Sequence, residues 1–507
     1  MSTATSEKLH PDVMPRVEEG KTTTSVSLAF TSLNTETDIA RLPTEGHLPD
    51  WLSGSLYRNG PAKFEHGDAS YRHWFDGLAM VHRYTFDHGK VSYRNRFLRT
   101  TPYEDMLRTG QLSAGFEATQ PSTLASRVFN ATLDLLGRRD NRTFNTNVNV
   151  VQLAGKVMAL TEQPVPTLFD GESLRTEGAF HYDDDLFGHL SCGHPQYDIK
   201  TGYYYNYLTR FGLTHSYNLY KVHERSTRRT LVATIPVSEP AYMHSFAITE
   251  NYIVLTEFPL VFNPMTALLS GKAPKDCLRW KPERGTQFRV IHKHTGAQVA
   301  HYESEAFFAF HHINAYEQAG DIIVDIAATD EPELMRKSYL KPLRAATRSE
   351  EHPLSEYHRY CLPLSTRSGG ALSYELLSEH RVEMVTVNAG AHNGRHYRYA
   401  YGVSHNTRWH NLVGQLVKAD VERRTSRVWF EPNTYPNEPI FVAAPGATRE
   451  DEGVILSVVL DTARARSFLL VLDAASFREL GRAHLPHHIP LEFHGTFVPA
   501  PASRPGH

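Results

Sequence analysis

Short runs of alternating apolar and polar residues dominate the chain from about residue 46 onward, and turn residues close most of them. Such alternation predicts β-strands with one buried face. The clearest runs cover residues 90–100, 147–162, 202–211, 246–258, 320–328, 396–403 and 453–474. Many short strands with few helical stretches favour a closed or radial all-β architecture, because a sandwich rarely needs this much chain.

Two segments break the strand pattern. Residues 104–139 carry apolar side chains at roughly helical spacing, among them Leu124 and Val128, and residues 258–272 form an apolar stretch that ends in a lysine. We expect both to be helices that cap the β body. The alternative is an apolar lip, flanked by basic residues, that dips into a membrane interface.

The two ends of the chain differ from its middle. Residues 1–45 are polar without clear periodicity and are predicted to form an N-terminal arm, followed by one β domain over residues 46–498 and a short tail at 499–507. The N-terminus lacks the apolar region of a secretory signal. No run of about eighteen apolar residues occurs, so no transmembrane helix is predicted. We therefore expect a cytoplasmic protein, with peripheral contact at a membrane surface as an alternative.

Composition narrows the class further. The 507 residues are 40% hydrophobic and 21% charged, which allows a large packed core. A net charge of −3 gives no basic footprint for nucleic acid, so nucleic-acid binding is excluded. Three cysteines (Cys192, Cys277, Cys361) are too few and too scattered for a disulfide framework or a paired-cysteine metal site.

The chain has 29 histidines, which is an unusually high number, so a single histidine is weak evidence of a site. Four stand in strand-like contexts and lie 50, 67 and 183 positions apart: His194, His244, His311 and His494. No local motif joins them, but a propeller can bring them together, because the inner strand of each blade faces a common axis. Their spacing alone leaves core or loop histidines as the alternative.

Five motifs occur in a distinctive order. They are RNGPAKFEHGDASYRHWFDGLAMVH (58–82), GHPQYD (193–198), FHHINAYEQAGDIIVD (310–325), NEPIFV (437–442) and FHGTF (493–497). Together they resemble the carotenoid cleavage oxygenase family from about residue 45 to 498. The resemblance implies a seven-bladed β-propeller, with a helical and loop dome over one face and one Fe(2+) per chain on the axis. After HWFDG the family often has Asp-Gly, whereas this chain has Leu78 and Ala79. In this respect the chain resembles the branch of the animal carotene oxygenases and the retinal-pigment isomerohydrolase.

The family pattern also implies the metal ligands. These are His194, His244, His311 and His494, with His311 rather than His312 taken from the adjacent pair. Neutral imidazoles suit iron(II), and each ring needs an acceptor for its second N–H. The resemblance supplies three: Glu162 for His244, Glu383 for His311 and Glu438 for His494, while His194 has none. Taken alone, each glutamate would be interpreted as a solvated strand edge.

Four histidine ligands leave two positions of an octahedral iron open, and Thr146 or Val148 is expected beside one of them. No side chain beyond the iron centre is predicted to act as nucleophile or acid. The protein is expected to aim a polyene at the metal and exclude water. Residues 58–61 and 73–77 are predicted to be structural, the first as a strand-to-turn element and the second as an inner-blade motif.

The implied activity is O2-dependent cleavage of a carbon–carbon double bond in a carotenoid or apocarotenoid, giving aldehydes or ketones, with retinal as one candidate product. Relatives that cleave stilbenes carry a lysine and a tyrosine where this chain has Thr161 and Phe97, so a phenolate would lose its partners. Ester isomerohydrolysis is a second alternative, although we find no cysteine-bearing lipid anchor. A non-catalytic pigment-binding propeller is the third, and the complete set of four histidines and three glutamates argues against it.

Overall fold

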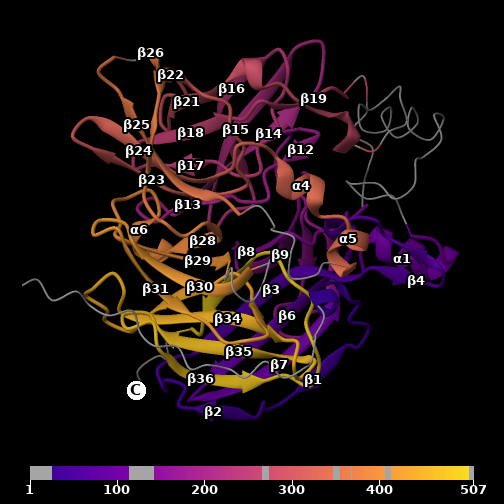
Figure 1. Ribbon diagram of the computed structural model, residues 1–507. Coiled ribbons are helices and arrows are strands. Elements are labelled where there is room, and N and C mark those ends of the chain that lie inside the picture. The colour runs from indigo at the N-terminus through magenta and orange to yellow at the C-terminus, as the bar shows by residue number, and fades with distance from the viewer. Residues whose placement is uncertain are drawn as a thin grey trace, which may run out of the picture.

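The computed structural model describes residues 26–112, 142–264, 266, 273, 275–345, 354–366, 368–405 and 413–501. Within these residues, seven sheets of four to six strands form the body of the molecule. The inner strands of neighbouring sheets contact one another around a common axis. This arrangement confirms the predicted seven-bladed β-propeller. In Figure 1 the blades from the middle of the chain lie at the top, and those built from its two ends lie at the bottom.

The first four blades come from the N-terminal and middle parts of the chain, and their strands are named from rim to axis. The first contains β1 (Thr37–Ile39), β7 (Lys90–Phe97), β6 (Leu78–Asp87), β3 (Gly54–Lys63) and β37 (Gly495–Pro499). The second contains β11 (Thr176–Ala179), β10 (Thr167–Phe169), β9 (Lys156–Leu160) and β8 (Asn149–Leu153). The third contains β16 (Arg229–Val237), β15 (His215–His223) and β14 (Tyr203–Arg210), on which β12 (Leu190–Ser191) and β13 (Gln196–Asp198) both pair. The fourth contains β26 (Ser368–Leu372), β22 (Gln298–Ser304), β21 (Thr286–His292), β18 (Tyr252–Glu257) and β17 (Ala247–Ile248).

The remaining three blades follow the same order. The fifth contains β27 (Tyr374–Leu376), β25 (Glu356–Pro363), β24 (Asp321–Ala328) and β23 (His312–Gln318). The sixth contains β31 (Thr425–Trp429), β30 (Val413–Asp420), β29 (Tyr399–His405) and β28 (Val382–Val387). The seventh contains β2 (Thr44–Gly46), β36 (Glu479–His484), β35 (Arg466–Asp473) and β34 (Gly453–Asp461), on which β32 (Thr434–Pro436) and β33 (Ile440–Ala443) both pair. Two small hairpins, β4 (Glu65–His66) with β5 (Ala69–Ser70) and β19 (Leu260–Phe262) with β20 (Leu278–Trp280), lie outside the blades.

The sequence patterns explain the position of each strand in its blade. In β7 the sequence KVSYRNRF alternates, and so does its burial, with every second side chain in the core. In β34 the run GVILSVVLD is apolar almost throughout, and all nine residues are buried. A strand covered on both faces gives such a continuous run, whereas a strand with one wet face alternates. Each strand-like run identified in the sequence overlaps with at least one of these strands.

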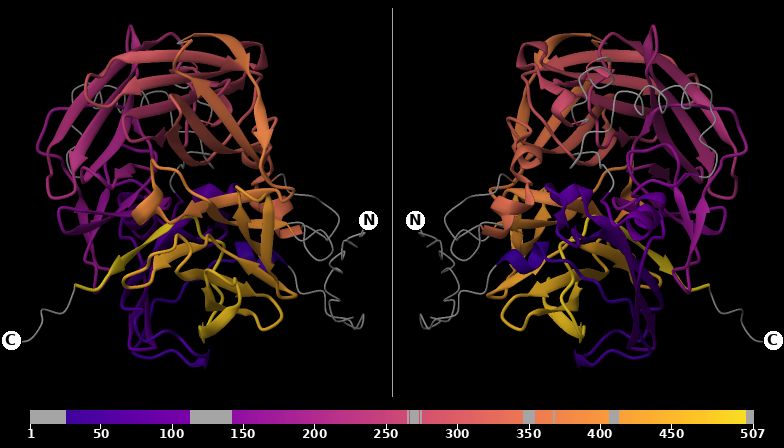
Figure 2. Two further views of the ribbon diagram at one scale, coloured as in Figure 1. Left: turned by 90° about the vertical axis from the view of Figure 1, so that its left-hand side faces the viewer. Right: turned by 90° about the vertical axis from the view of Figure 1, so that its right-hand side faces the viewer.

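Both ends of the described chain close the ring. β37 pairs with β3 in the first blade, so the last strand becomes the innermost strand of the blade that the chain builds first. β2 pairs with β36 in the seventh blade. Figure 2 shows this closure as indigo strands beside yellow ones. The predicted arm (1–45) therefore overlaps with β1 and β2, which are blade strands. The division into arm, domain and tail otherwise stays a prediction.

Short helices gather on one side of the propeller. They are α1 (Thr101–Thr109), α4 (Glu333–Lys337) and α5 (Leu340–Ala345), which Figure 1 shows together at the right, while α6 (Ala389–His392) lies apart. Short 3-10 helices are η1 (Val26–Phe30), η2 (Trp74–Asp76), η3 (Lys275–Cys277) and η4 (Pro282–Arg284). Of the predicted capping helices, residues 113–141, 265 and 267–272 lie outside the described residues, and residues 260–262 form β19 instead of a helix. No helix in the described part of the chain is long and apolar enough to span a membrane.

Candidate metal centre

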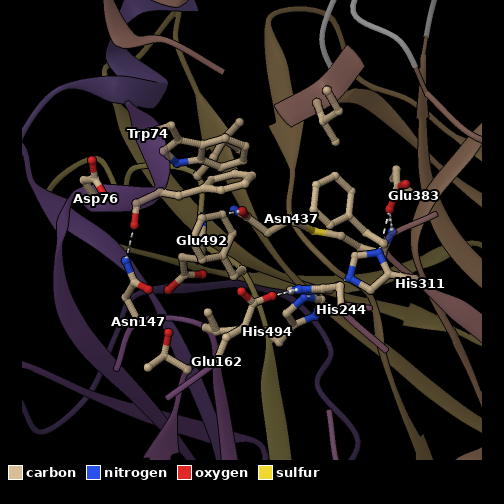
Figure 3. Close-up of a pocket in the computed structure, with 18 of the residues that line it drawn as sticks. Trp74, Asp76, Asn147, Glu162, His244, His311, Glu383, Asn437, Glu492 and His494 are labelled. Carbon is tan, nitrogen blue, oxygen red and sulfur yellow. Dashed lines mark hydrogen bonds and ion pairs between the residues drawn. The ribbon is translucent and has the colours of Figure 1, made fainter. Parts of the chain in front are cut away.

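Each of the four predicted histidines stands one to three residues before the first residue of an inner strand. His194 precedes β13, His244 precedes β17, His311 precedes β23 and His494 precedes β37. Inner strands of a propeller begin close to its axis, so residues at this position converge although they lie far apart in sequence. One ligand nitrogen of each histidine lies within 4.8 Å of the corresponding nitrogens of the others. The structure thus brings all four together, and Figure 3 shows the rings of three of them, His244, His311 and His494, side by side.

The spacing of the ring nitrogens fits a metal ion. The Nε2 atoms of His194 and His244 are 3.0 Å apart, and those of His311 and His494 are 3.2 Å apart. A metal about 2.1 Å from each of two imidazole nitrogens at a right angle would hold them about 3 Å apart. Where Nδ1 carries the proton, Nε2 presents a lone pair. Lone pairs that face one another at this distance repel, and a cation between them removes the repulsion.

Three carboxylates hold three of the rings, in the pairing that the sequence suggested. Nδ1 of His244 donates to Oε1 of Glu162, Nδ1 of His311 to Oε2 of Glu383, and Nδ1 of His494 to Oε1 of Glu438. Each of these hydrogen bonds is 2.7 Å long (Figure 3 shows the first two). A carboxylate on Nδ1 fixes the tautomer that leaves Nε2 free for a metal, and it also fixes the orientation of the ring.

Each carboxylate is held in turn by a different donor. The hydroxyl of Tyr242 donates to Glu162 at 2.6 Å, and the hydroxyl of Ser355 donates to Glu383 at 2.5 Å. Glu438 forms a buried ion pair with Arg58 and also accepts from the backbone N–H of Gly495 at 3.1 Å. Residues 58–61, predicted to be a structural strand-to-turn element, lie inside β3 instead, and from there Arg58 contacts a carboxylate of the cluster. Nothing in its local sequence indicated this contact, because Glu438 lies 380 positions away.

Burial sets the charge states in the cluster. It lowers the pKa of His194 and of His494 far below the usual range of an imidazole, and the neighbouring histidine rings lower it further. Burial raises the pKa of the Glu383 carboxyl, but His311, the Ser355 hydroxyl and the Met384 N–H together lower it by more, so the net shift is downward. For Glu438, burial outweighs the opposing effect of Arg58, and the pKa is raised. The buried rings therefore favour the neutral form, in which an imidazole can bind a metal.

Every blade contributes one residue to this arrangement. The first, third, fourth and fifth blades supply the histidines. The second blade supplies Glu162 just after β9, the sixth supplies Glu383 in β28, and the seventh supplies Glu438 between β32 and β33. The seven blades thus place four imidazole rings and three carboxylates around one axis. Imidazoles can bind a divalent cation, and the carboxylates can balance its charge.

A cavity of about 400 Å³ opens above the histidines. This volume lies within the roughly 300–1,000 Å³ of typical small-ligand pockets. Aromatic rings form much of its wall, with Trp74 4.9 Å and Phe75 5.3 Å from the ring centre of Phe493. Trp74 and Phe75 belong to η2, so the prediction of residues 73–77 as an inner-blade motif is wrong: the segment is a short helix on the cavity wall (Figure 3). Val148 lines the cavity, whereas Thr146 is fully buried beside it.

Two further histidines from the sequence motifs have structural surroundings. His312 points away from the cluster and hydrogen-bonds with Ser245 at 2.9 Å and Thr256 at 2.8 Å, and burial lowers its pKa to about 3. His73 contacts the backbone oxygen of Met335 at 2.9 Å, which ties η2 to α4. The structure therefore brings His311, and not its neighbour, into the cluster.

The two positions that bear on phenolic substrates lie in different places. Thr161 lines the large cavity next to Glu162. Phe97 packs in the core, with its ring centre 5.2 Å from that of Tyr103, and does not line this cavity. The cavity wall therefore has a neutral hydroxyl at Thr161, where a stilbene-cleaving relative would have an ammonium group.

Comparison with known proteins agrees with this geometry. The family model described as retinal pigment epithelial membrane protein matches residues 30–499. The mitochondrial carotenoid-cleaving dioxygenase of Macaca fascicularis is 35% identical over 510 residues, which cover 90% of this chain and 91% of the relative. The β,β-carotene 15,15'-dioxygenase of Gallus gallus is 31% identical, with 90% and 94% covered. A variant of the Synechocystis apocarotenoid oxygenase aligns with a TM-score of 0.80 at 24% identity, covering 93% of this chain and 98% of its own, and bears on the fold.

Proposed function

Because this chain belongs to the family of the retinal pigment epithelial membrane protein and the carotenoid-cleaving dioxygenases, we propose that it is a non-haem iron dioxygenase. Its substrate is a carotenoid or apocarotenoid, in which it cleaves one carbon–carbon double bond to give aldehyde or ketone products. The observation that carries this proposal is the convergence of four histidines, three of them held by carboxylates, at the base of a large aromatic cavity.

Iron(II) is the metal that we propose for the four histidines. Imidazole ligands suit iron among several divalent metals, and a site that leaves coordination positions open is typical of non-haem oxygenases. His194, His244, His311 and His494 would hold the ion, with Glu162, Glu383 and Glu438 keeping three of the rings in place. When bound, the iron supplies the activation of dioxygen that no protein side chain provides.

The rest of the chain positions the substrate. The aromatic wall formed by Trp74, Phe75, Phe310 and Phe493 suits a flat, conjugated hydrocarbon, since aromatic faces pack well against such chains. Holding one double bond beside the open coordination positions lowers the entropic cost of reaction. Val148 contacts this region, because it lines the cavity while its backbone oxygen accepts from the N–H of His494 at 3.0 Å. No acid or base on the chain is required.

Product analysis tests the substrate class. Protein purified without oxygen, expected to hold about one iron per chain, is incubated under oxygen with β-carotene, an apocarotenal, a retinyl ester and resveratrol. We expect aldehydes or ketones from the polyenes and little turnover of resveratrol, because Thr161 offers a phenolate no cation. Cleavage of resveratrol alone, or isomerisation of the ester alone, would replace this proposal by the corresponding alternative.

Adjacent histidines provide a matched test of the metal site. His311→Ala removes a proposed ligand and should abolish both bound metal and turnover. His312→Gln changes the next residue, whose ring contacts Ser245 and Thr256 outside the cluster, and should keep the metal. Retention of metal and turnover by His311→Ala would contradict the assignment.

A cytoplasmic location with peripheral membrane contact is also part of the proposal. An apolar polyene partitions into membranes, so an enzyme that takes it up gains from contact with the bilayer surface. The names of relatives include a mitochondrial and a chloroplastic form, so the compartment has to be measured. Fractionation of the source cells, with and without a high-salt wash of the membranes, separates cytoplasmic, peripheral and organellar protein.

A further inference from the structure

A second, smaller cavity lies between the second and third blades, next to the metal centre. Its volume is about 30 Å³, which is enough for one small molecule. Strands β8 and β9 form one wall and β14 and β15 the other, and most of the lining is apolar, with Val151, Leu153, Met158, Leu160 and Val222 among its residues. Nothing in the proposed handling of the polyene uses this space.

The small cavity meets the large one beside Glu162. Thr161 and Gln163, on either side of that glutamate, line both cavities. On the third blade, Cys192 and Pro195 line the small cavity immediately before and after the segment that carries His194. The small cavity therefore ends at the histidine that has no carboxylate partner.

Gly193 lies between lining residues of the two cavities. It follows Cys192, which lines the small cavity, and a Cβ atom placed on it would lie 3.2 Å from Cγ1 of Val148, which lines the large one, and 3.8 Å from the carbonyl carbon of Thr161. A side chain at Gly193 would therefore crowd Val148 next to His194.

Two polar side chains in the wall of the small cavity, those of Asn206 and Cys192, are bonded within the protein. Nδ2 of Asn206 donates to the backbone oxygen of Cys192 at 3.0 Å, and its Oδ1 accepts from the N–H of Tyr207 at 2.8 Å. The thiol of Cys192 donates to the backbone oxygen of His244 at 3.0 Å. Among the described residues, no fully buried side-chain nitrogen or oxygen of this lining lacks a hydrogen-bond partner. The mostly apolar wall has room for a small apolar guest.

We propose that this cavity holds dioxygen and delivers it to the metal centre from the His194 side. The inference rests on the proposed function, because it requires a polyene in the large cavity. A polyene bound there buries most of its surface and fills the space above the histidines. The second substrate, which is small and apolar, then needs a separate approach, and the cavity between the blades adjoins His194, the one proposed ligand that no carboxylate holds by a hydrogen bond in the described part of the chain.

Xenon tests the cavity without any turnover, since it binds in dry apolar cavities. Crystals of the full chain pressurised with xenon should show a xenon site between β8 and β15, in contact with Val151 and Val222. Val151→Phe should remove this site by filling the space. Val299→Phe, which enlarges a half-buried strand valine in the fourth blade that lines neither cavity, should retain it. Xenon in the large cavity alone would overturn the proposal.

Steady-state kinetics tests delivery. Val151→Phe should raise KM for dioxygen several-fold while KM for the polyene and the iron content stay at wild-type values, and Val222→Leu should give a smaller increase in the same direction. Val299→Phe should leave KM for dioxygen unchanged. Equal KM values for dioxygen in Val151→Phe and Val299→Phe would overturn delivery through this cavity. Failure of the proposed function gives a different result, namely no polyene turnover by the wild-type protein while xenon still binds.

Discussion

The two sides of the histidine cluster are built differently. On one side His244, His311 and His494 each donate to a carboxylate, and we refer to these three as the anchored histidines. On the other side, His194 forms no ion pair with a carboxylate in the described part of the chain and borders a small apolar cavity. The anchored side can hold a metal firmly through fixed rings. The His194 side remains neutral and leaves room for a small molecule beside the metal.

Burial also differs among the anchored histidines. The side chains of His494 and Glu438 are both 7% exposed, and their neighbour Arg58 is 1% exposed. The side chains of His244 and Glu162 are 11% and 16% exposed, and Glu162 accepts from a tyrosine hydroxyl instead of an arginine. A charged anchor deep in the protein depends on its partner more than a partly exposed one does, because water cannot replace a lost contact there.

Removing a histidine from each side gives the largest expected effect. Both His194→Ala and His494→Ala should lose the bound metal and all turnover. In the metal-free state, His494→Ala should also be less stable than His194→Ala by about 1.5–3 kcal/mol, because Glu438 loses a charge-assisted hydrogen bond that has no counterpart at His194. Metal analysis and denaturant unfolding check both parts. Equal stabilities of the two metal-free variants would remove the distinction between the sides.

The candidate site could be predicted from sequence because motifs that contain some of its residues resemble a known family, and the family pattern then implied the others. Glu438 in NEPIFV and His494 in FHGTF are examples, and the structure brings both to the axis. The partners of these residues could not be predicted in the same way. Arg58 lies in RNGP at the N-terminal end of the chain, and only the closure of the ring by β37 brings it to Glu438.

The match to the family pattern limited the prediction in a second place. The sequence left Thr146 and Val148 as equal candidates beside the open coordination site, because the local match is ambiguous by two residues. In the structure the N–H of Asn147 donates to the backbone oxygen of Asn145 at 3.0 Å, so the segment turns before β8 begins. The turn buries Thr146 and leaves Val148 on the cavity wall. Local backbone conformation, which a motif does not encode, separates the two residues in this way, and which of them lies beside the open coordination site stays a prediction.

Arg58→Met should give the next largest effect, this time on stability. It leaves Glu438 without its cation and Glu492, whose carboxylate lies 3.5 Å from Nε of Arg58, without its nearest positive charge. Breaking a buried ion pair in this way costs about 3–5 kcal/mol. Arg94→Met, which breaks the more exposed pair with Asp38 in the same blade, should cost less than about 1 kcal/mol. Denaturant unfolding of the two variants makes the comparison, and equal losses would contradict the special role of Arg58.

Glu383→Gln should act on the metal more than on the fold. The amide still accepts the hydrogen bond from His311 but no longer supplies a negative charge, so the ring becomes a weaker ligand. A loss of roughly 10–100-fold in metal affinity is expected for such a change. Glu317→Gln is a matched control, since that carboxylate accepts from Thr249 and Asn251, away from the cluster. Metal titration measures both, and unchanged affinity in Glu383→Gln would show that the ring does not depend on its anchor.

Ser355→Ala should have the smallest effect of the series. Glu383 keeps its hydrogen bonds from Nδ1 of His311 at 2.7 Å and from the backbone N–H of Met384 at 3.1 Å, and loses only the serine hydroxyl. One hydrogen bond contributes about 1 kcal/mol, so metal affinity should fall by several-fold, less than in Glu383→Gln. Ser355→Thr, which keeps a hydroxyl, should restore most of it. If Ser355→Ala weakened the metal as much as Glu383→Gln does, the orientation of the carboxylate would matter as much as its charge, and the anchored side would depend on its outermost contacts.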